Sequence, residues 1–284
     1  MKAHRDEFSI ARMCAVLGVS VSGYYDWCER PVSQREQANA ALVAEIRQVH
    51  AESLETYGSP RVHQELSERG QHCSRKRIER LMRKHGIRGK CKRRRKVVTT
   101  DAQHRLPVAP NQLNQEFDAE APNRKWVADI TYIPTAEGWL YLACVLDLFS
   151  RKIVGWAMDQ TMTTSLVTDA LDMALHQRNP TVGLLHHSDR GSQYASLDYQ
   201  ARLAAHHIQV SMSRTGNCYD NAVMESFWAT LKTERTYDQA YPTRSDARTD
   251  LFLFIEGFYN RRRRHSALGY LSPDHFERNF HLGI

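Results

Sequence analysis

Three carboxylates stand where an acidic side chain needs a particular reason to be. Asp129 lies inside KWVADITYIPT, a stretch of residues that favour strands. Asp189 ends the apolar run VGLLHHSD, and Glu225 lies in NAVMESFWATLKTE, which has a helical pattern. A carboxylate within a strand is unfavourable unless it is exposed, paired or bound to a metal. Two strand aspartates and one helix glutamate make an all-oxygen ligand set, which suits Mg²⁺ or Mn²⁺ and not zinc.

Such a ligand set predicts phosphodiester chemistry. Two divalent ions about 3.5–4 Å apart can activate an attacking hydroxyl and stabilise the leaving oxygen. The protein then contributes position and charge, and the ions contribute the activation.

Each carboxylate also has a simpler explanation. Ser188-Asp189-Arg190-Gly191 is ordinary turn chemistry, so Asp189 can be a turn residue. Asp129 can be a charge on an edge strand, and Asp147 is an equally apolar-flanked rival for its role. Glu225 can be one more helix acid, with Asp220 as a rival that also suits a helix N-cap. Spacing alone leaves these alternatives open.

The segments around these acids predict a mixed α/β fold. The strands expected at 125–135, 139–149 and 152–158 have short connections, which favours an antiparallel meander. A helix over 161–178, an apolar strand over 182–189, a helix over 196–206, a strand over 208–213 and a helix from near Tyr219 follow. In a sheet of this class, ligands gather at the carboxyl ends of strands. If the first and fourth strands are neighbours, Asp129 and Asp189 can face each other.

The charge distribution predicts a nucleic-acid partner. The net charge is +7, and residues 1–120 hold 22 Lys/Arg against 15 Asp/Glu, whereas residues 121–284 hold 17 of each. Residues 61–105 alone hold 16 basic and 4 acidic side chains. This asymmetry favours a polyanion bound through phosphate neutralisation. The alternative is a solvated basic helix followed by a tail.

The N-terminal third predicts two helical modules. Residues 7–28 favour two short helices around Gly18, either a helix-turn-helix or a plain helical hairpin. A helix over 34–54 follows, then one capped by Ser59 with Pro60 in its first turn, and one capped by Ser74. The last of these begins with basic residues, so it is the better candidate for reading a DNA groove. The predicted DNA contacts here are Arg75, Lys76, Arg80, Lys92, Arg93, Arg94, Arg95 and Lys96.

These patterns predict five parts of the chain. They are a helix-turn-helix-like segment (1–33), a second helical DNA-binding module with a basic tail (34–96), a linker (97–121), a catalytic core (122–240) and a basic helical extension (241–284). No apolar run approaches the ~20 residues that cross a bilayer, and MKAHRDEFSI lacks an apolar signal core, which favours a cytoplasmic protein. The six cysteines lack paired zinc-ligand spacing.

Five motifs, in order, resemble a known family. They are WVADITYIPT, YLACVLDLFSRKIVGW, HHSDRGSQYAS, SRTGNCYDNAVMESFWATLKTE and FYNRRRRHSALGYLSP, and the likeness extends upstream through YGSPRVHQEL and LGVSVSGYYDW. They resemble bacterial insertion-sequence transposases of the DDE superfamily, of the type encoded in a second reading frame, with a core similar to retroviral integrase. Thirty-five residues separate Asp189 from Glu225, as in that family.

The resemblance implies both a fold and an activity. It implies a ribonuclease-H-like core in which Asp129, Asp189 and Glu225 bind metal and catalyse, with Mg²⁺ or Mn²⁺ as cofactor, as two ions. It implies cleavage at insertion-sequence ends and strand transfer into target DNA. Lys232 matches the family's basic residue at the terminal DNA. Arg261 and Arg262, and with less support Arg263, Arg264 and His265, are expected near DNA, although a run of four arginines can also be a solvated helix end.

The resemblance also implies partners. We expect DNA (terminal repeats and target), a homo-oligomer on DNA, an additional first-reading-frame product, and no membrane. The zinc-binding His-His-Cys-Cys module of retroviral integrases is missing. Two other functions fit the same residues: a DNA-binding regulator with a catalytically silent core, and a structure-directed nuclease without joining activity.

Overall fold

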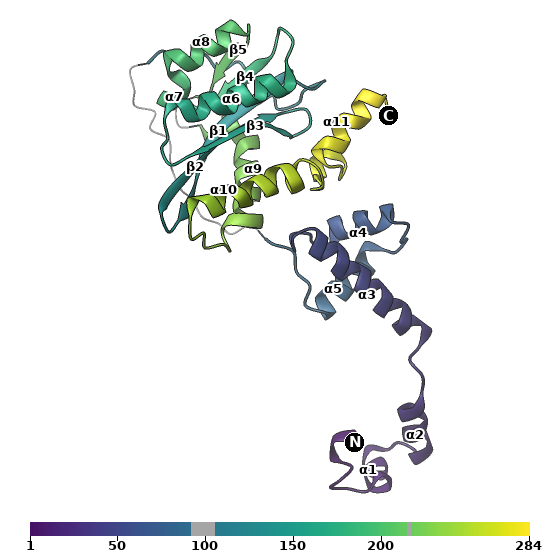
Figure 1. The fold of residues 1–284 in the computed structure, drawn as a ribbon. Helices are drawn as coiled ribbons and strands as arrows, with labels where there is room; N and C mark the ends of the chain where they lie inside the picture. Colours follow the sequence, from purple (N-terminus) through teal and green to yellow (C-terminus); the bar gives the residue numbers. More distant parts are fainter. Residues whose placement is uncertain (92–105, 215–216) are drawn as a thin grey trace.

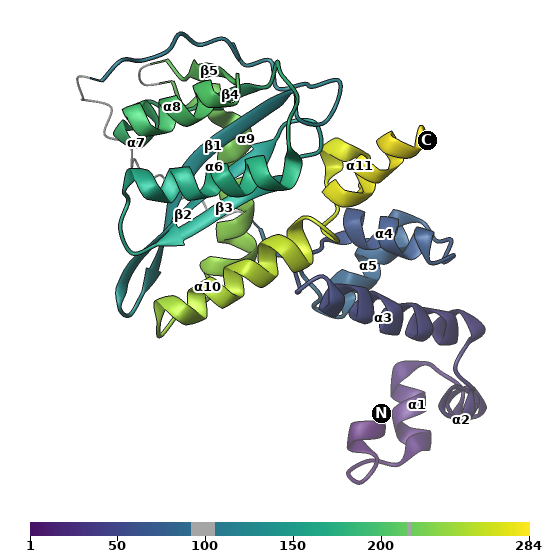
Figure 2. The same cartoon turned by 45° about the horizontal axis from the view of Figure 1, so that its top comes forward.

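The N-terminal segment forms a pair of short helices. In a computed structural model, the described residues are 1–91, 106–214 and 217–284. A turn at Lys2–His4 precedes α1 (Ile10–Leu17) and α2 (Val21–Glu29). Gly18 adopts the left-handed conformation between them, and the Ser20 hydroxyl accepts from the backbone N–H of Gly23. Figures 1 and 2 show this pair apart from the rest of the chain.

A second helical module follows, made of α3 (Gln34–Glu52), α4 (Ser59–Glu68) and α5 (Arg75–Lys84). Its core contains Ile46, Leu66 and Ile78, all fully buried. The expectation that Ser59 caps α4 is wrong: Gly58 holds the N-cap position, without a side-chain hydrogen bond. Ser59 is instead the first residue of α4, and Pro60 is the second, where its missing N–H removes no intrahelical hydrogen bond.

The rest of the chain is built on a five-stranded mixed sheet. The strands are β1 (Lys125–Thr135), β2 (Gly138–Asp147), β3 (Ile153–Asp159), β4 (Leu185–Ser188) and β5 (Gln209–Met212), in the order β3-β2-β1-β4-β5. Antiparallel pairing joins β1 to β2 and β2 to β3, and parallel pairing joins β1 to β4 and β4 to β5. The neighbouring positions of β1 and β4 place Asp129, in the middle of β1, beside Asp189, which directly follows β4.

Helices cover both faces of the sheet (Figures 1 and 2). One face carries α6 (Thr164–Arg178) and α8 (Leu197–Ala205), which pack on Trp126 and Ala128 of β1. The short α7 (Ser192–Ala195) precedes α8. The other face carries α9 (Ala222–Leu231), which packs on Val127. Because side chains alternate along a strand, Asp129 points to the α9 face together with Val127.

The C-terminal segment closes the α9 face. It contains α10 (Arg244–Phe252), a π-helical continuation (Leu253–Tyr259), a short turn (Ser266–Leu268) and α11 (Pro273–Leu282). The Asn260 side chain accepts from the backbone N–H of Ile153 at 2.9 Å and donates to its carbonyl at 3.0 Å. These two bonds tie the segment to the outer strand β3.

Part of the predicted linker packs against the sheet. The backbone N–H groups of Gln112 and Leu113 donate to the Ser211 hydroxyl of β5, and Leu113 is buried. The expected fold class is confirmed in its architecture, because helices precede a five-stranded mixed sheet that carries helices on both faces. Within the described residues, none of the helices is long and apolar enough to cross a membrane.

Candidate active site

The two aspartates lie beside each other where β4 ends next to the middle of β1. In the parallel β1–β4 pair, Val127 is in register with His187, and Asp129 and Asp189 each follow two residues later. Two hydrogen bonds hold the Asp129 carboxylate: the Ile130 N–H donates to Oδ1 at 2.8 Å, and the Trp228 indole Nε1–H donates to Oδ2 at 2.9 Å. The carboxylate is therefore fixed from its own strand and from α9.

Asp189 is held by the turn that ends β4. The Gly191 N–H donates to Asp189 Oδ1 at 2.8 Å. A Cβ at position 191 would come within 3.0 Å of that same oxygen, so glycine leaves room for this short return of the chain. The turn explanation and the site explanation therefore describe one arrangement, because the turn positions the carboxylate beyond the strand end.

Glu225 approaches the aspartates from the facing helix. It lies in the first turn of α9 and its side chain is exposed. Its charge contributes to raising the pKa of Asp129, which puts it near the pair. Across residues 1–91, 106–214 and 217–284, however, three His, Cys, Asp or Glu side chains never converge closely enough to hold a metal ion. The structure thus brings two of the predicted residues together and leaves the third on the helix opposite.

The surroundings of Asp129 disfavour its ionised form. Burial and the neighbouring charge of Asp189 raise the pKa of Asp129 from 3.8 to about 7, against the hydrogen bonds from Trp228 and Ile130. Burial also raises the pKa of Glu225. A strongly shifted carboxyl group in a cleft is typical of a functional site.

An aromatic-walled cleft opens beside the aspartates. Its volume is about 290 Å³, and Asp129, Asp189, Tyr132, Trp139 and Gln193 are among its lining residues. The Tyr132 and Trp139 rings meet edge to face with centroids 4.7 Å apart, and Trp139 is 49% exposed. Exposed rings of this kind can stack on nucleic-acid bases.

Lys232 lies at the end of α9, where a π-helical turn begins (Lys232–Thr236). Its ammonium group stands 5.2 Å from the centroid of the Tyr132 ring. Burial lowers the pKa of Lys232, while the charge of Asp129 works in the opposite direction. Lys232 therefore belongs to the same side of the molecule as the cleft.

Sequence reasoning missed three contributors to this site. Trp228 holds Asp129, and Tyr132 and Trp139 form the cleft wall. One signal for Trp228 was available, because it lies three residues after Glu225 and so shares that side of the helix. The pairing of Tyr132 with Trp139 depends on the β1–β2 register, which sequence spacing did not specify.

The two rival acids have structural partners. Asp147 is fully buried, accepts from the backbone N–H groups of Asn123 and Phe149, and lies 3.4 Å from the Arg178 guanidinium. Asp220 accepts from Arg214 at its backbone and its guanidinium. The Arg214 hydrogen bonds lower the pKa of Asp220, as expected for a paired carboxylate. Both Asp147 and Asp220 therefore have a structural role, because each accepts hydrogen bonds that hold a loop in place.

The basic residues of α5 divide into two sets. The predicted DNA contacts Arg75, Lys76 and Arg80 are exposed. Arg77 turns inward, where its guanidinium donates to Asn39 Oδ1 at 2.8 and 3.0 Å. The remaining predicted contacts of this module, Lys92, Arg93, Arg94, Arg95 and Lys96, lie outside the described residues.

The four-arginine run also divides, which corrects part of the sequence interpretation. Arg261 and Arg262 are exposed, as DNA contact requires. Arg263 is buried and donates to both oxygens of Glu234, at 2.7 and 2.5 Å. Arg264 is buried and bonds Glu65 and Glu68 of α4.

His265 follows the two buried arginines. Burial, followed by the charges of Arg263, Arg61 and Arg151, keeps its pKa well below the usual range. Arg263, Arg264 and His265 therefore form the joint between the helical module and the C-terminal segment, and the expectation that they contact DNA is wrong.

Family models and relatives agree with this architecture. Models described as "Integrase core domain" match residues 119–218 and 206–273, and one described as "HTH-like domain" matches residues 36–95. A Transposase InsF of insertion sequence IS3A from Escherichia coli is 44% identical over 279 residues, which is 98% of this chain and 96% of the relative. The chain belongs to this family of insertion-sequence transposases.

One further relative and one solved structure were also matched to this transposase. A 31 kDa protein of insertion element IS600 from Shigella sonnei is 48% identical over 270 residues, covering 95% of this chain and 98% of the relative. The catalytic core domain of HTLV-2 integrase in complex with magnesium is 15% identical, with a TM-score of 0.44 over 56% of this chain and 99% of that one. The expected enzyme class, a transposase with an integrase core and so a polynucleotidyl transferase, is confirmed by the family models and by the Escherichia coli relative.

Proposed function

We propose that this transposase cuts DNA at the ends of its insertion sequence and joins the freed strand to another, with Asp129, Asp189 and Glu225 as the metal-binding catalytic residues. The observation that carries the proposal is the pair of neighbouring aspartates on β1 and at the end of β4, opposed by Glu225 on α9. The proposal also assigns functions to two parts of the chain. Residues 34–96 bind DNA, and residues 122–240 form the catalytic core.

The donor set fits divalent cations. Three carboxylates offer only oxygen ligands, which Mg²⁺ and Mn²⁺ prefer. The raised pKa of Asp129 has the sign expected where two negative charges face each other without a cation. Two bound ions would supply activation of a hydroxyl or water and stabilisation of the leaving oxygen.

The chain's own residues orient the reacting groups. Trp228 and the Ile130 N–H fix Asp129, and the Gly191 N–H fixes Asp189, so neither carboxylate has to reorganise. Tyr132 and Trp139 offer ring faces against which an unpaired terminal base can stack. Lys232 can contact a phosphate of the same DNA end from α9.

The DNA contacts spread over two further surfaces. Arg75, Lys76 and Arg80 on α5 approach a groove or its phosphates, and the segment that contains Lys92 to Lys96 adds phosphate contacts. Arg261 and Arg262 add to these near the core. Two element ends must be held together for joining, so we propose a homo-oligomer on DNA, assisted by a first-reading-frame product, acting on the nucleoid in the cytoplasm.

One experiment tests the assignment. A labelled duplex that carries the element end is incubated with the full chain in Mg²⁺ or in EDTA, for wild type, Asp189→Asn and the exposed control Asp198→Asn on α8. We expect cleavage and joined product only with Mg²⁺, loss of both in Asp189→Asn with retained DNA binding, and no change in Asp198→Asn.

The other outcomes distinguish the alternatives. Strand joining by the Asp189→Asn variant would contradict the assignment of Asp189 to the metal site. Cleavage without joining by the wild-type chain would mark a nuclease, and DNA binding without cleavage in any condition would mark a regulator.

A further inference from the structure

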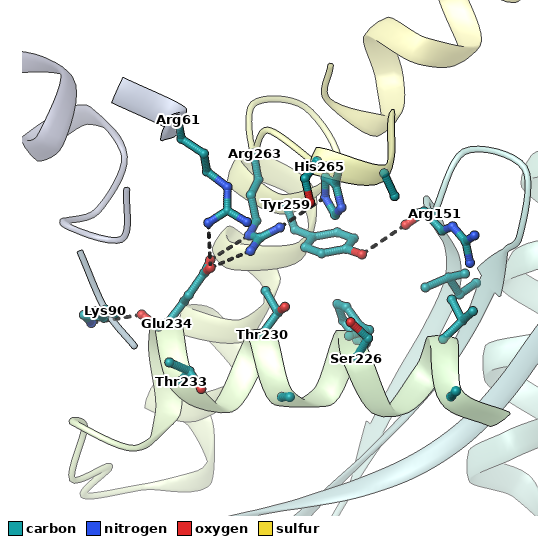
Figure 3. Close-up of a pocket in the computed structure, with 17 residues that line it drawn as sticks. Arg61, Lys90, Arg151, Ser226, Thr230, Thr233, Glu234, Tyr259, Arg263 and His265 are labelled. Carbon is teal, nitrogen blue, oxygen red and sulfur yellow. Dashed lines mark hydrogen bonds and ion pairs between the residues drawn. The ribbon is translucent and has the colours of Figure 1, made fainter. Parts of the chain in front are cut away.

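A second cavity lies at the joint between the helical module and the core. Its volume is about 460 Å³, and it opens between α9, the α4 end of the module and the C-terminal segment (Figure 3). Ser226 and Thr230 of α9, the helix that also carries Glu225, and Thr233 of the π-helical turn that follows line one side of it. The cavity is thus attached to the catalytic helix but lacks the two aspartates among its lining residues.

Its charged lining is predominantly positive. Four cationic side chains, from Arg61, Lys90, Arg151 and Arg263, face a single carboxylate, that of Glu234. Glu234 is largely neutralised by Arg263, with which it forms two hydrogen bonds of 2.7 and 2.5 Å. Figure 3 shows Glu234 at the centre of these contacts and Arg151 at the far end of the cavity.

The other cations are weakly compensated. Arg61 stands 3.7 Å from Glu234, and the Lys90 ammonium donates to the Glu234 backbone carbonyl at 2.9 Å, which leaves its charge intact. Within the described residues, the Arg151 guanidinium has neither a hydrogen bond nor an ion pair, although the Arg151 carbonyl accepts from the Tyr259 hydroxyl. The cavity therefore has an excess of positive charge in half-buried surroundings.

The titration behaviour of its lining agrees with this excess. Burial and the charge of Arg263 lower the pKa of Arg61, and burial lowers that of Arg151. His265 stays neutral because of burial and the charges of Arg263, Arg61 and Arg151. Half-buried cations that lack matching carboxylates are costly unless an anion accompanies them.

We infer that this cavity binds the phosphodiester backbone of DNA, with Arg151 and Arg61 as its principal phosphate contacts. The inference rests on the proposed function, because the bound strand is the one that reaches Glu225. The cations left to meet phosphate come from the helical module (Arg61 and Lys90) and from the β2–β3 turn (Arg151), a spread that suits successive phosphates of a polymer better than one small anion. A strand leaving the catalytic site along α9 would pass Ser226 and Thr230 and enter this cavity.

Substitution of Arg151 tests the inference most directly. Its backbone forms the turn after β2, where its N–H donates to the Asp147 carbonyl at 2.8 Å, and this bond does not involve the side chain. Arg151→Gln therefore removes the charge and leaves the described contacts in place. Arg278→Gln, at an exposed position on α11, removes an equal charge elsewhere and serves as the matched control.

The measurement is the salt dependence of DNA binding by the full chain in EDTA, with cooperative thermal unfolding checked for each variant. Loss of one phosphate contact should reduce the slope of log affinity against log salt by about 0.9 and weaken binding roughly 5- to 10-fold at low salt. Arg151→Lys should restore most of the slope, and Arg278→Gln should match wild type.

Two results would overturn the inference. One is an unchanged slope in Arg151→Gln. The other is thermal stabilisation by inorganic pyrophosphate in wild type but not in Arg151→Gln, with identical DNA slopes, which would mean that the cavity takes a free anion. Because EDTA removes catalysis from the assay, a transposase that binds DNA without cutting it would fail the proposed function and still test this cavity.

Discussion

Two groups of charges in this transposase are built in opposite ways. Where β4 ends beside β1, burial and the neighbouring charge of Asp189 raise the pKa of Asp129 to about 7. At the module joint, Arg263 and Glu234 place opposite charges together with two hydrogen bonds. The pair of opposite charges holds a fixed contact, whereas the pair of like charges makes the ionised form of Asp129 costly. The surroundings of a charged residue therefore indicate its role better than its type does.

Breaking the joint should give the largest effect on stability. Glu234→Ala leaves the buried Arg263 guanidinium without its carboxylate, at a cost of roughly 3–5 kcal/mol in the free energy of unfolding. Urea denaturation measures this change. Arg261→Ala, at an exposed position in the same run, should change the free energy by less than about 0.5 kcal/mol. Equal effects of the two substitutions would contradict the division of the four-arginine run.

Weakening the support of Asp129 should give an intermediate effect. Trp228→Phe removes the indole N–H that donates to Oδ2, and a hydrogen bond to a charged group contributes about 1.5–3 kcal/mol. Loss of this donor disfavours the ionised carboxylate, so the pKa of Asp129 should rise further, by about one unit or more. The pH profile of strand joining should move to higher pH by a similar amount. A lower rate with an unmoved profile would mean that Trp228 only packs.

Removing the charge of Asp129 should give a smaller change of opposite sign. The pKa of Asp129 in the folded protein is about 7, above the ordinary 3.8. The carboxyl group therefore does not lower the free energy of unfolding below pH 3.8, and it lowers it increasingly between about pH 4 and pH 7. Asp129→Asn should therefore raise the Tm in EDTA at pH 8 by about 2–4 °C, which corresponds to about 1 kcal/mol, and by less at pH 5. Scanning calorimetry at both pH values measures this. A lower Tm at pH 8 would contradict the electrostatic account.

Local patterns predicted the elements well and the long-range contacts poorly. The first strand was expected at 125–135 and lies at Lys125–Thr135, because β-favouring residues and turn signals are local. The helix cap at Ser74 was also predicted, whereas the cap at Ser59 was wrong, because α4 begins one residue earlier with Gly58 at the N-cap. Sequence patterns therefore identify where a helix or strand begins to within one or two residues.

The buried arginines show what local reasoning leaves out. Arg264 pairs with Glu65 and Glu68, about two hundred residues away in the chain, and Arg263 pairs with Glu234. A run of four basic residues is identical in sequence whether it meets DNA or carboxylates, so only the fold separates Arg261 and Arg262 from Arg263 and Arg264. The aspartates were expected to face each other only if the first and fourth strands were neighbours, and the parallel pairing of β1 and β4 meets that condition.

The most direct test of the metal assignment is the ion dependence of strand joining by Asp189→Cys. A thiolate is a softer ligand than a carboxylate and accepts Mn²⁺ more readily than Mg²⁺. The account predicts that Asp189→Cys loses joining in Mg²⁺ by at least about 100-fold and regains part of it in Mn²⁺, while Asp189→Asn stays inactive with both ions. Joining by Asp189→Cys in Mg²⁺ at the wild-type rate, or equal inactivity of Asp189→Cys and Asp189→Asn in Mn²⁺, would contradict the claim that Asp189 binds the catalytic metal.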